Sequence, residues 1–149
     1  MNSKTSLKTL QKNKPFDAVR NHHSNETAED YTELIADLIL TKGEARIGEI
    51  AKSMGISHVT ALRSVQRLHR DGYVISQSHQ PIQLTEKGKL LAAYAKQRHL
   101  LLLEFLKKLG VPETQAAIDV EGMEHHVSEI TLKAIEQHMK VLNTHEIKK

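Results

Sequence analysis

The stretch 47-IGEIAKSMGISHVTALRSVQRLHRDG-72 decides the fold, because it holds two amphipathic helical patterns joined by a very short turn at Gly55. Apolar side chains recur every three or four positions in each pattern, which places them on one face of a helix. The two inner faces consist of Ile47, Ile50, Ala51 and Met54, and of Ala61, Val65 and Leu68. Ser57 is a natural N-cap for the second helix. The stretch therefore predicts a helix-turn-helix motif.

The flanking sequence extends this motif in both directions. Before it, apolar residues repeat at helical spacing from Ala28 onward, and Gly43 supplies a stop. After it, 73-YVISQSHQPIQLTEKG-88 has two short β-prone runs around a polar turn with Pro81, and Thr85 then caps another helix. This order of helices and hairpin is typical of a winged helix-turn-helix, a DNA-binding motif.

The rest of the chain is predicted to be helical. A long helix runs from Thr85 to about Leu109, a short helix starts at Pro112, and a last helix is capped by Ser128. The long helix has more apolar surface than a small winged domain can bury. Such surplus surface indicates a partner, most simply a second copy of the chain.

Composition narrows the class of protein further. The 149 residues include no Cys, which fits a reducing cytosol and excludes thiolate metal sites. No segment approaches the roughly 20 apolar residues that span a membrane, and no signal peptide is evident, so a soluble cytoplasmic protein is expected. The net charge of +3 lies in residues 1–28, and the remainder has 16 basic and 16 acidic side chains. Attraction to nucleic acid must therefore come from this basic arm and from local clusters.

One such cluster lies on the second helix of the motif. Thr60, Arg63 and Arg67 fall on the face opposite its apolar stripe, and Arg can bind guanine bidentately. Other contacts to bases or phosphates are expected from the start of this helix and from the wing, namely Ser57, His58, Ser78 and His79, with His69, Arg70 and Gln80 as secondary candidates. The alternative is a solvated basic helix face without a partner.

A second cluster surrounds 121-EGMEHH-126. On a helix, Glu121, Glu124 and His125 would share one face, because positions i, i+3 and i+4 are neighbours. Asp30 and Glu33 form a similar pair on the first helix, and His99 lies among leucines in the long helix. Carboxylates and imidazoles suit Mn²⁺ or Fe²⁺, although each feature alone also fits an ordinary helix surface. Spacing by itself does not bring the three segments together.

Taken together, 29-EDYTEL-34, the winged motif, 98-RHLLLLEFL-106 and 119-DVEGMEHHVS-128 resemble the manganese-responsive (MntR) branch of the diphtheria toxin repressor (DtxR) family. The resemblance covers roughly residues 29–142. It implies a homodimeric repressor of manganese uptake genes that binds a palindromic operator in double-stranded DNA when metal is present. It also implies a two-ion site between the halves, with the ligands Asp30, Glu33, His99, Glu121, Glu124 and His125.

The same resemblance bears on the identity of the metal. The iron-responsive branch has Met in place of Asp30 and Cys in place of Glu121, so oxygen at both positions favours Mn²⁺, with Fe²⁺ or Zn²⁺ as alternatives. His126 is expected to be packed, the alternative being a hydrogen-bond partner of the ligands. The chain departs from the family's pattern at Val59 and Ser64 of the recognition helix and in the lack of a glycine at the wing tip. A C-terminal SH3-like domain, found in many members of the iron branch, is expected to be absent.

The expected organisation is mainly α, with a winged helix-turn-helix DNA-binding domain followed by an all-helical dimerisation and metal-binding domain. The boundaries are a flexible basic arm at 1–28, the winged domain at 29–92, the helical domain at 93–143 and a tail at 144–149. A metal-independent DNA-binding protein is one rival. A small di-metal hydrolase is another, but the chain lacks the motifs of such enzymes, so it is expected not to be an enzyme and to bind no small organic ligand.

Overall fold

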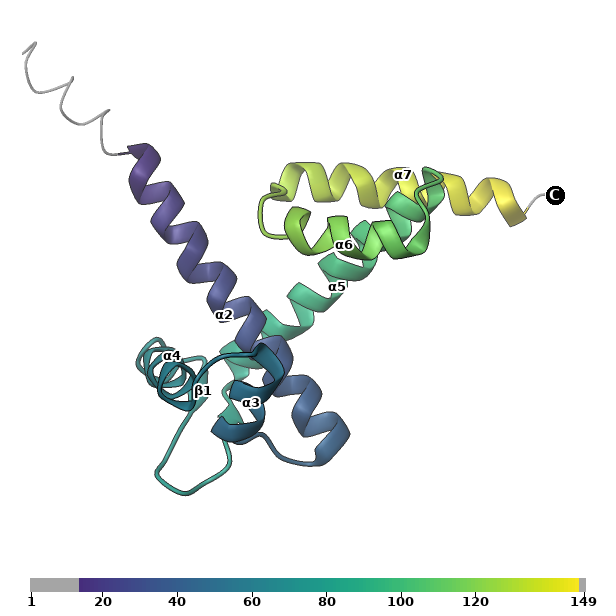
Figure 1. Cartoon of the computed structure of the whole chain (residues 1–149). Helices are drawn as coiled ribbons and strands as arrows, with labels where there is room; N and C mark the ends of the chain where they lie inside the picture. The colour runs from purple at the N-terminus through teal and green to yellow at the C-terminus, as the bar shows by residue number, and fades with distance from the viewer. Residues whose placement is uncertain (1–13, 148–149) are drawn as a thin grey trace, which may run out of the picture.

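The computed structural model describes the backbone of residues 14–147 and the side chains of residues 26–147. It is mainly helical with one small hairpin, as the sequence predicts (Figure 1). In chain order the elements are α2 (Lys14–Lys42), α3 (Ile47–Met54), α4 (His58–Arg70), β1 (Val74–Ile75), β2 (Gln83–Leu84), α5 (Glu86–Lys108), α6 (Glu113–Met123) and α7 (Glu129–Ile147). None of the described helices is long and apolar enough to cross a lipid bilayer.

Helix α2 begins at Lys14, earlier than the expected start at Ala28. Residues 1–13 of the expected flexible arm lie outside the described residues, but residues 14–28 are helical. No Gly or Pro interrupts the sequence from position 16 to Lys42, and Pro15 falls in the first turn, where the missing N–H costs nothing. The weak apolar periodicity before Ala28 hid this extension.

The N-terminal half packs α2, α3, α4 and the hairpin around one core. Ile35 of α2 shares this buried core with Ile50 of α3 and Val65 of α4. The predicted turn is present, since Gly55 ends α3 with φ 66° and the Ser57 hydroxyl accepts the Thr60 N–H at 3.1 Å. These contacts make α2 part of the body that carries α4.

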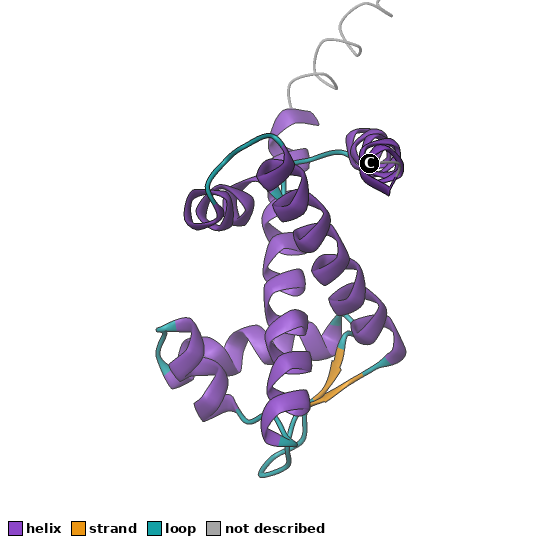
Figure 2. Ribbon diagram, turned by 90° about the vertical axis from the view of Figure 1, so that its right-hand side faces the viewer, coloured by secondary structure: helices purple, strands orange, loops and turns teal. Residues whose placement is uncertain are grey.

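The wing is a short antiparallel pair in which Val74 faces Leu84 and Ile75 faces Gln83. At its tip His79 has φ 61°, a conformation that usually favours glycine. The wing tip lacks the glycine of the family's pattern, and His79 adopts the left-handed conformation there. Figure 2 shows the hairpin at the opposite end of the molecule from the C-terminus.

Helix α5 connects the wing to a second core. Its N-cap Thr85 accepts the Gly88 N–H at 3.1 Å, and a Cβ at Gly88 would lie 2.1 Å from the Tyr73 carbonyl oxygen, so this contact requires glycine. At its far end the buried core of α5, α6 and α7 consists of Leu102, Leu106, Ala116, Val120 and Leu132. Figure 1 shows α6 and α7 along this end of α5, away from α3 and α4. Since α2 packs along α5, the two helices join the halves.

Candidate metal centre and DNA-binding face

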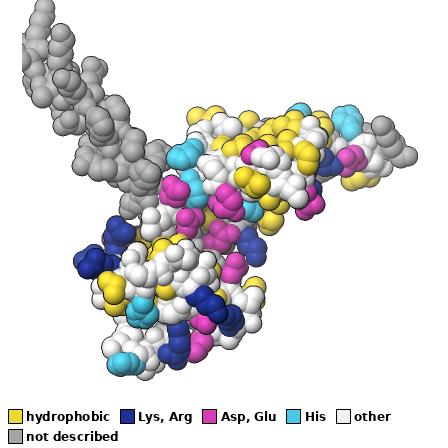
Figure 3. Space-filling model, in the orientation of Figure 1, with side chains coloured by type: hydrophobic (Ala, Val, Ile, Leu, Met, Phe, Trp, Pro, Cys, Tyr) yellow, Lys and Arg dark blue, Asp and Glu magenta, His cyan; other side chains and the backbone are white. Residues whose placement is uncertain are grey.

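The predicted metal ligands meet where the two halves of the molecule join. Asp30 and Glu33 come from α2, His99 from the middle of α5, and Glu124 and His125 from the turn after α6. Figure 3 shows acidic side chains gathered at this junction with histidines beside them. The fold thus brings together three segments that sequence spacing alone could not connect.

Glu124 lies at the centre of the cluster and is only 4% exposed. One of its oxygens, Oε2, lies 2.7 Å from His99 Nδ1, and the other, Oε1, lies 3.4 Å from His125 Nε2. His125 Nε2 is also 3.4 Å from Asp30 Oδ1. Four of the six predicted ligands are therefore in direct polar contact.

The other two predicted ligands act on this group electrostatically. Burial raises the pKa of Glu33, and the negative charge of Glu124 raises it further. Burial also raises the pKa of Asp30 to about 6, where attraction to His125 is opposed by repulsion from carboxylates that include Glu121. Glu121 itself is exposed. The cluster holds more negative charge than its two histidines can neutralise, which is the condition that a bound cation relieves.

The local structure of EGMEHH differs from the expected continuous helix. Helix α6 ends at Met123, and the His126 N–H bonds to the Met123 carbonyl oxygen three residues back, which tightens the chain into a turn. Glu124 caps α6 with helical backbone angles, φ −60° and ψ −29°, and its N–H still bonds to the Val120 carbonyl oxygen, so its spacing from Glu121 remains that of a helix. His125 follows in the turn. His126, expected to be packed, is exposed.

Two further carboxylates lie beside the candidate centre, and sequence reasoning missed both. Glu26, one helical turn before Asp30, can place an oxygen within 4.8 Å of ligand atoms of Asp30 and His125. Glu29 is buried and accepts hydrogen bonds from Arg98 of α5 and from His125 Nδ1. The i, i+4 spacing of Glu26 and Asp30 could have predicted that both lie on one face of the helix. Nothing in the sequence predicts that Glu29 pairs with Arg98.

The donor set fits a divalent cation. Its ligand atoms are carboxylate oxygens and imidazole nitrogens, which suit Mn²⁺, Fe²⁺ and Zn²⁺. His125 Nε2 and the carboxylates of Asp30 and Glu124 converge from α2 and the α6–α7 turn, so a cation held by them would join these two elements.

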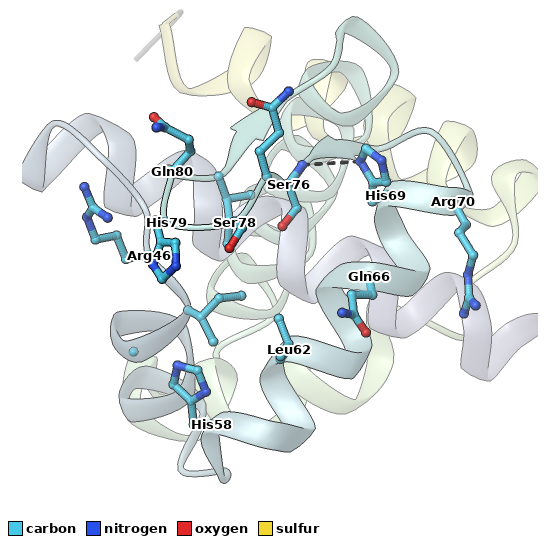
Figure 4. A pocket seen from close by; sticks show the side chains of 14 residues that line it. Arg46, His58, Leu62, Gln66, His69, Arg70, Ser76, Ser78, His79 and Gln80 are labelled. Atoms are coloured by element: carbon cyan, nitrogen blue, oxygen red, sulfur yellow. Dashed lines mark hydrogen bonds between the residues drawn. The ribbon is translucent and has the colours of Figure 1, made fainter.

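The second candidate surface is the exposed side of α4 and the wing. The predicted contact residues Ser57, His58, Thr60, Arg63, Arg67, Ser78 and His79 are all exposed. A groove of ≈ 880 Å³ lies between α4 and the wing, with His58, Ser78 and His79 in its lining (Figure 4). Thr60, Arg63 and Arg67 are outside this lining.

Sequence reasoning did not anticipate every basic side chain at the groove. Arg46 comes from the segment before α3 and lines it together with Arg70 and Gln66 of α4. His69 Nδ1 lies 3.1 Å from the Val74 carbonyl oxygen and 3.3 Å from the Ser76 backbone nitrogen (Figure 4). His69 therefore ties α4 to the start of the wing.

Comparison with known proteins gives this arrangement a family. Two family models match the chain: the iron dependent repressor N-terminal DNA binding domain at residues 23–80, and the iron dependent repressor metal binding and dimerisation domain at residues 85–147. The chain is 41% identical over 119 residues to the transcriptional regulator MntR of Salmonella typhimurium, covering 80% of this chain and 76% of that protein. It is also 41% identical over 100 residues to the regulator MntR of Bacillus subtilis, covering 67% of this chain and 70% of that protein.

Solved structures agree with this placement. A manganese-dependent transcriptional repressor in complex with manganese matches 76% of this chain at a TM-score of 0.68 and 28% identity. The manganese regulator SloR, at 24% identity and a TM-score of 0.66, shows the same fold. This chain spans about half of the length of these solved chains, 52% and 53%. The relatives named are transcriptional regulators and not enzymes. The chain therefore belongs to the iron dependent repressor family, as a metal-dependent DNA-binding regulator that carries a dimerisation domain.

Proposed function

We propose that this protein is a manganese-dependent homodimeric repressor of manganese uptake genes. The observation that carries the proposal is the convergence of Asp30, Glu124 and His125 at the junction between the DNA-binding half and the C-terminal half. The identity to MntR regulators supports manganese as the metal. A DNA-binding regulator acts where the DNA is, so we place the protein in the cytoplasm.

Manganese also fits the chemistry of the donors. The centre offers oxygen and nitrogen atoms and no sulfur, which disfavours the softer metals that thiolates select. The six ligands that we propose are Asp30, Glu33, His99, Glu121, Glu124 and His125. Each of the four carboxylates has two oxygens, so the set offers more donor atoms than one octahedral ion requires. Carboxylates can also bridge two ions, and we therefore propose two Mn²⁺ per subunit. Fe²⁺ and Zn²⁺ remain the competing ions because they accept the same donors.

The residues of the centre control DNA binding through α2. Asp30 and Glu33 lie on the same helix as Ile35, which packs in the core with Val65 of α4. When bound, the metal supplies positive charge that carboxylates of both halves share. His99, Glu124 and His125 then hold α2 in one position, and α4 is held with it. DNA binding costs less ordering entropy in that state, so metal and DNA affinities rise together.

The dimer interface is proposed to lie on the C-terminal half. Large apolar side chains such as Leu109, Ile118 and Ile130 are exposed there, and Figure 3 shows hydrophobic side chains across this region. A two-fold dimer would present two copies of α4, which suits a palindromic operator. We propose that Ser57, His58, Thr60, Arg63, Arg67, Ser78 and His79 contact this operator.

The experiment that tests the proposal is a Mn²⁺ titration followed by electron paramagnetic resonance. The wild-type protein should bind about two ions per chain, and Asp30→Ala should lose at least one of them. Asp37→Ala is the matched control, because Asp37 is an exposed carboxylate on the same helix. Parallel titrations with Fe²⁺ and Zn²⁺ rank the competing ions. Mn²⁺ binding that does not saturate would contradict the manganese assignment, and equal binding by both variants would contradict the site.

A further inference from the structure

Glu29 is a buried carboxylate next to Asp30 that the proposed ligand set does not use. It is 8% exposed, and its carboxylate lies between α5 and the α6–α7 turn. Its Oε1 accepts from Arg98 Nη1 at 3.2 Å, and its Oε2 accepts from Arg98 Nη2 at 2.5 Å and from His125 Nδ1 at 2.9 Å. Both oxygens are thus engaged by groups from two other elements.

The pairing with Arg98 decides which nitrogen of His125 carries a proton. Both oxygens of a carboxylate in a two-pronged pair with arginine accept hydrogen bonds. The contact at 2.9 Å therefore requires Nδ1–H as the donor. Nε2 faces Asp30 Oδ1 and Glu124 Oε1, each 3.4 Å away.

The ion pair between Glu29 and Arg98 is buried, and the burial of two charged groups costs free energy. Arg98 is 7% exposed, and its Nε has no hydrogen-bond partner among the described residues. Buried ion pairs often stabilise a fold no more than apolar residues of the same size would. The Arg98 guanidinium also lies 5.3 Å from the centre of the Tyr94 ring, and the Tyr94 hydroxyl donates to Glu129 of α7. Arg98 is therefore held on more than one side, which restricts the carboxylate that it grips.

From this geometry we propose that Glu29 is a positioning residue of the metal centre, which holds His125 with Nδ1 protonated and Nε2 directed at the metal, while Arg98 holds Glu29. The proposal rests on the proposed function, because His125 is a ligand only if the centre binds metal. Glu29 thus contacts α5 through Arg98 and the α6–α7 turn through His125.

The test uses two double variants that both remove the buried charge pair. Glu29→Met/Arg98→Met leaves His125 without an acceptor, whereas Glu29→Gln/Arg98→Met keeps a neutral carbonyl oxygen that can still accept from Nδ1. Loss of a ligand's hydrogen-bond partner typically lowers metal affinity by about 10–100-fold. We expect the first variant to bind Mn²⁺ about 10–100-fold more weakly than wild type, and the second to recover most of this loss. Thermal melting checks that both are folded at the titration temperature.

Nitrogen-15 NMR of the histidine rings in the metal-free protein provides a second readout, with the His125 signals identified by their loss in His125→Gln. Wild type should show a protonated Nδ1, and Glu29→Met/Arg98→Met should show a changed tautomer mixture. An unprotonated Nδ1 in wild type would overturn the proposal, even if neither variant folds. Equal Mn²⁺ affinity of the two folded double variants would also overturn it. Failure of wild type to bind Mn²⁺ would instead contradict the proposed function, and the NMR result would still decide the role of Glu29.

Discussion

The DNA-binding face and the metal centre are built in opposite ways. The DNA-binding face comes from neighbouring residues, 57–79, on one helix and the adjoining wing, and its side chains are exposed. The metal centre draws on α2, α5 and the α6–α7 turn, and its central carboxylate, Glu124, is buried. The first is therefore a surface that works as long as α4 is folded. The metal centre exists only when the whole chain has folded, which suits a site whose occupancy affects the DNA-binding half.

Removal of the Glu124 side chain should impair the metal centre most strongly and leave the DNA-binding face intact. Glu124→Ala deletes the side chain that contacts both His99 and His125. We expect Mn²⁺ affinity to fall by at least about 100-fold. This is more than the loss usually seen when only the hydrogen-bond partner of a ligand is removed. The metal-free, non-specific DNA affinity should stay unchanged, because α4 is untouched. Isothermal titration calorimetry and fluorescence anisotropy measure the two quantities. The control Glu136→Ala removes an exposed carboxylate of α7.

The converse change affects the DNA-binding face alone. Arg63→Ala removes an exposed guanidinium from α4, and one base-contacting arginine contributes about 1–3 kcal/mol to specific binding. The expected result is weaker operator binding by that amount with Mn²⁺ affinity unchanged in the absence of DNA. Lys140→Ala, on α7, is the control. A change in Mn²⁺ affinity of the free Arg63 variant would contradict the separation of the two regions.

Low pH should weaken Mn²⁺ binding at the metal centre. Burial raises the pKa of Asp30 from 3.8 to about 6, so this carboxyl is increasingly protonated as the pH falls through about 6. Metal must displace that proton, and Mn²⁺ affinity should therefore fall by up to about tenfold per pH unit below 6. EPR titrations near pH 7 and pH 5 test this, with Asp30→Asn as the variant that should lose much of the pH dependence.

The same pKa shift predicts an opposite trend in metal-free stability. A carboxyl with a raised folded pKa favours the folded state while it is protonated, and this contribution is lost as the pH rises through about 6. Urea unfolding of the metal-free protein should show this loss in wild type and less of it in Asp30→Asn. Stability that falls by the same amount in both proteins would contradict the assignment to Asp30.

The smallest expected effect is local to the DNA-binding half. The Ser57 hydroxyl caps α4 by accepting the Thr60 N–H, and loss of such a cap costs about 1 kcal/mol of stability. Ser57→Ala should lower the urea midpoint accordingly and leave Mn²⁺ stoichiometry unchanged. Ser53→Ala, an exposed serine in α3, is the matched control. A change in Mn²⁺ stoichiometry would show that the two regions are coupled even in this local contact.

The sequence predicted well those features that depend on neighbouring residues. The turn at Gly55, the caps at Ser57 and Thr85, and the wing between Val74 and Leu84 follow from short-range spacing, and the structure confirms them. The early start of α2 at Lys14 was missed because its first turns lack an apolar stripe.

The metal centre was predictable only in part. The polar spacing named candidate ligands, but the family resemblance was needed to bring them together. The contact between Glu29 and Arg98 joins residues 69 positions apart and has no periodic signal. Sequence patterns report which face of a helix is polar, whereas the partner across a helix interface depends on how the helices cross. The helical reading of EGMEHH holds through the C-cap Glu124, and the chain then turns at His125 and His126.

The central claim is that the metal centre controls the DNA-binding face across the junction between the halves. The most direct test measures the affinity of wild-type protein for an operator selected from random DNA in the presence of Mn²⁺, as free Mn²⁺ is varied. Fluorescence anisotropy reports DNA binding, and electron paramagnetic resonance reports metal binding on the same samples. We predict that DNA affinity rises about 5–150-fold over the range in which the centre fills. Unchanged DNA affinity while the centre fills with Mn²⁺ would contradict the account.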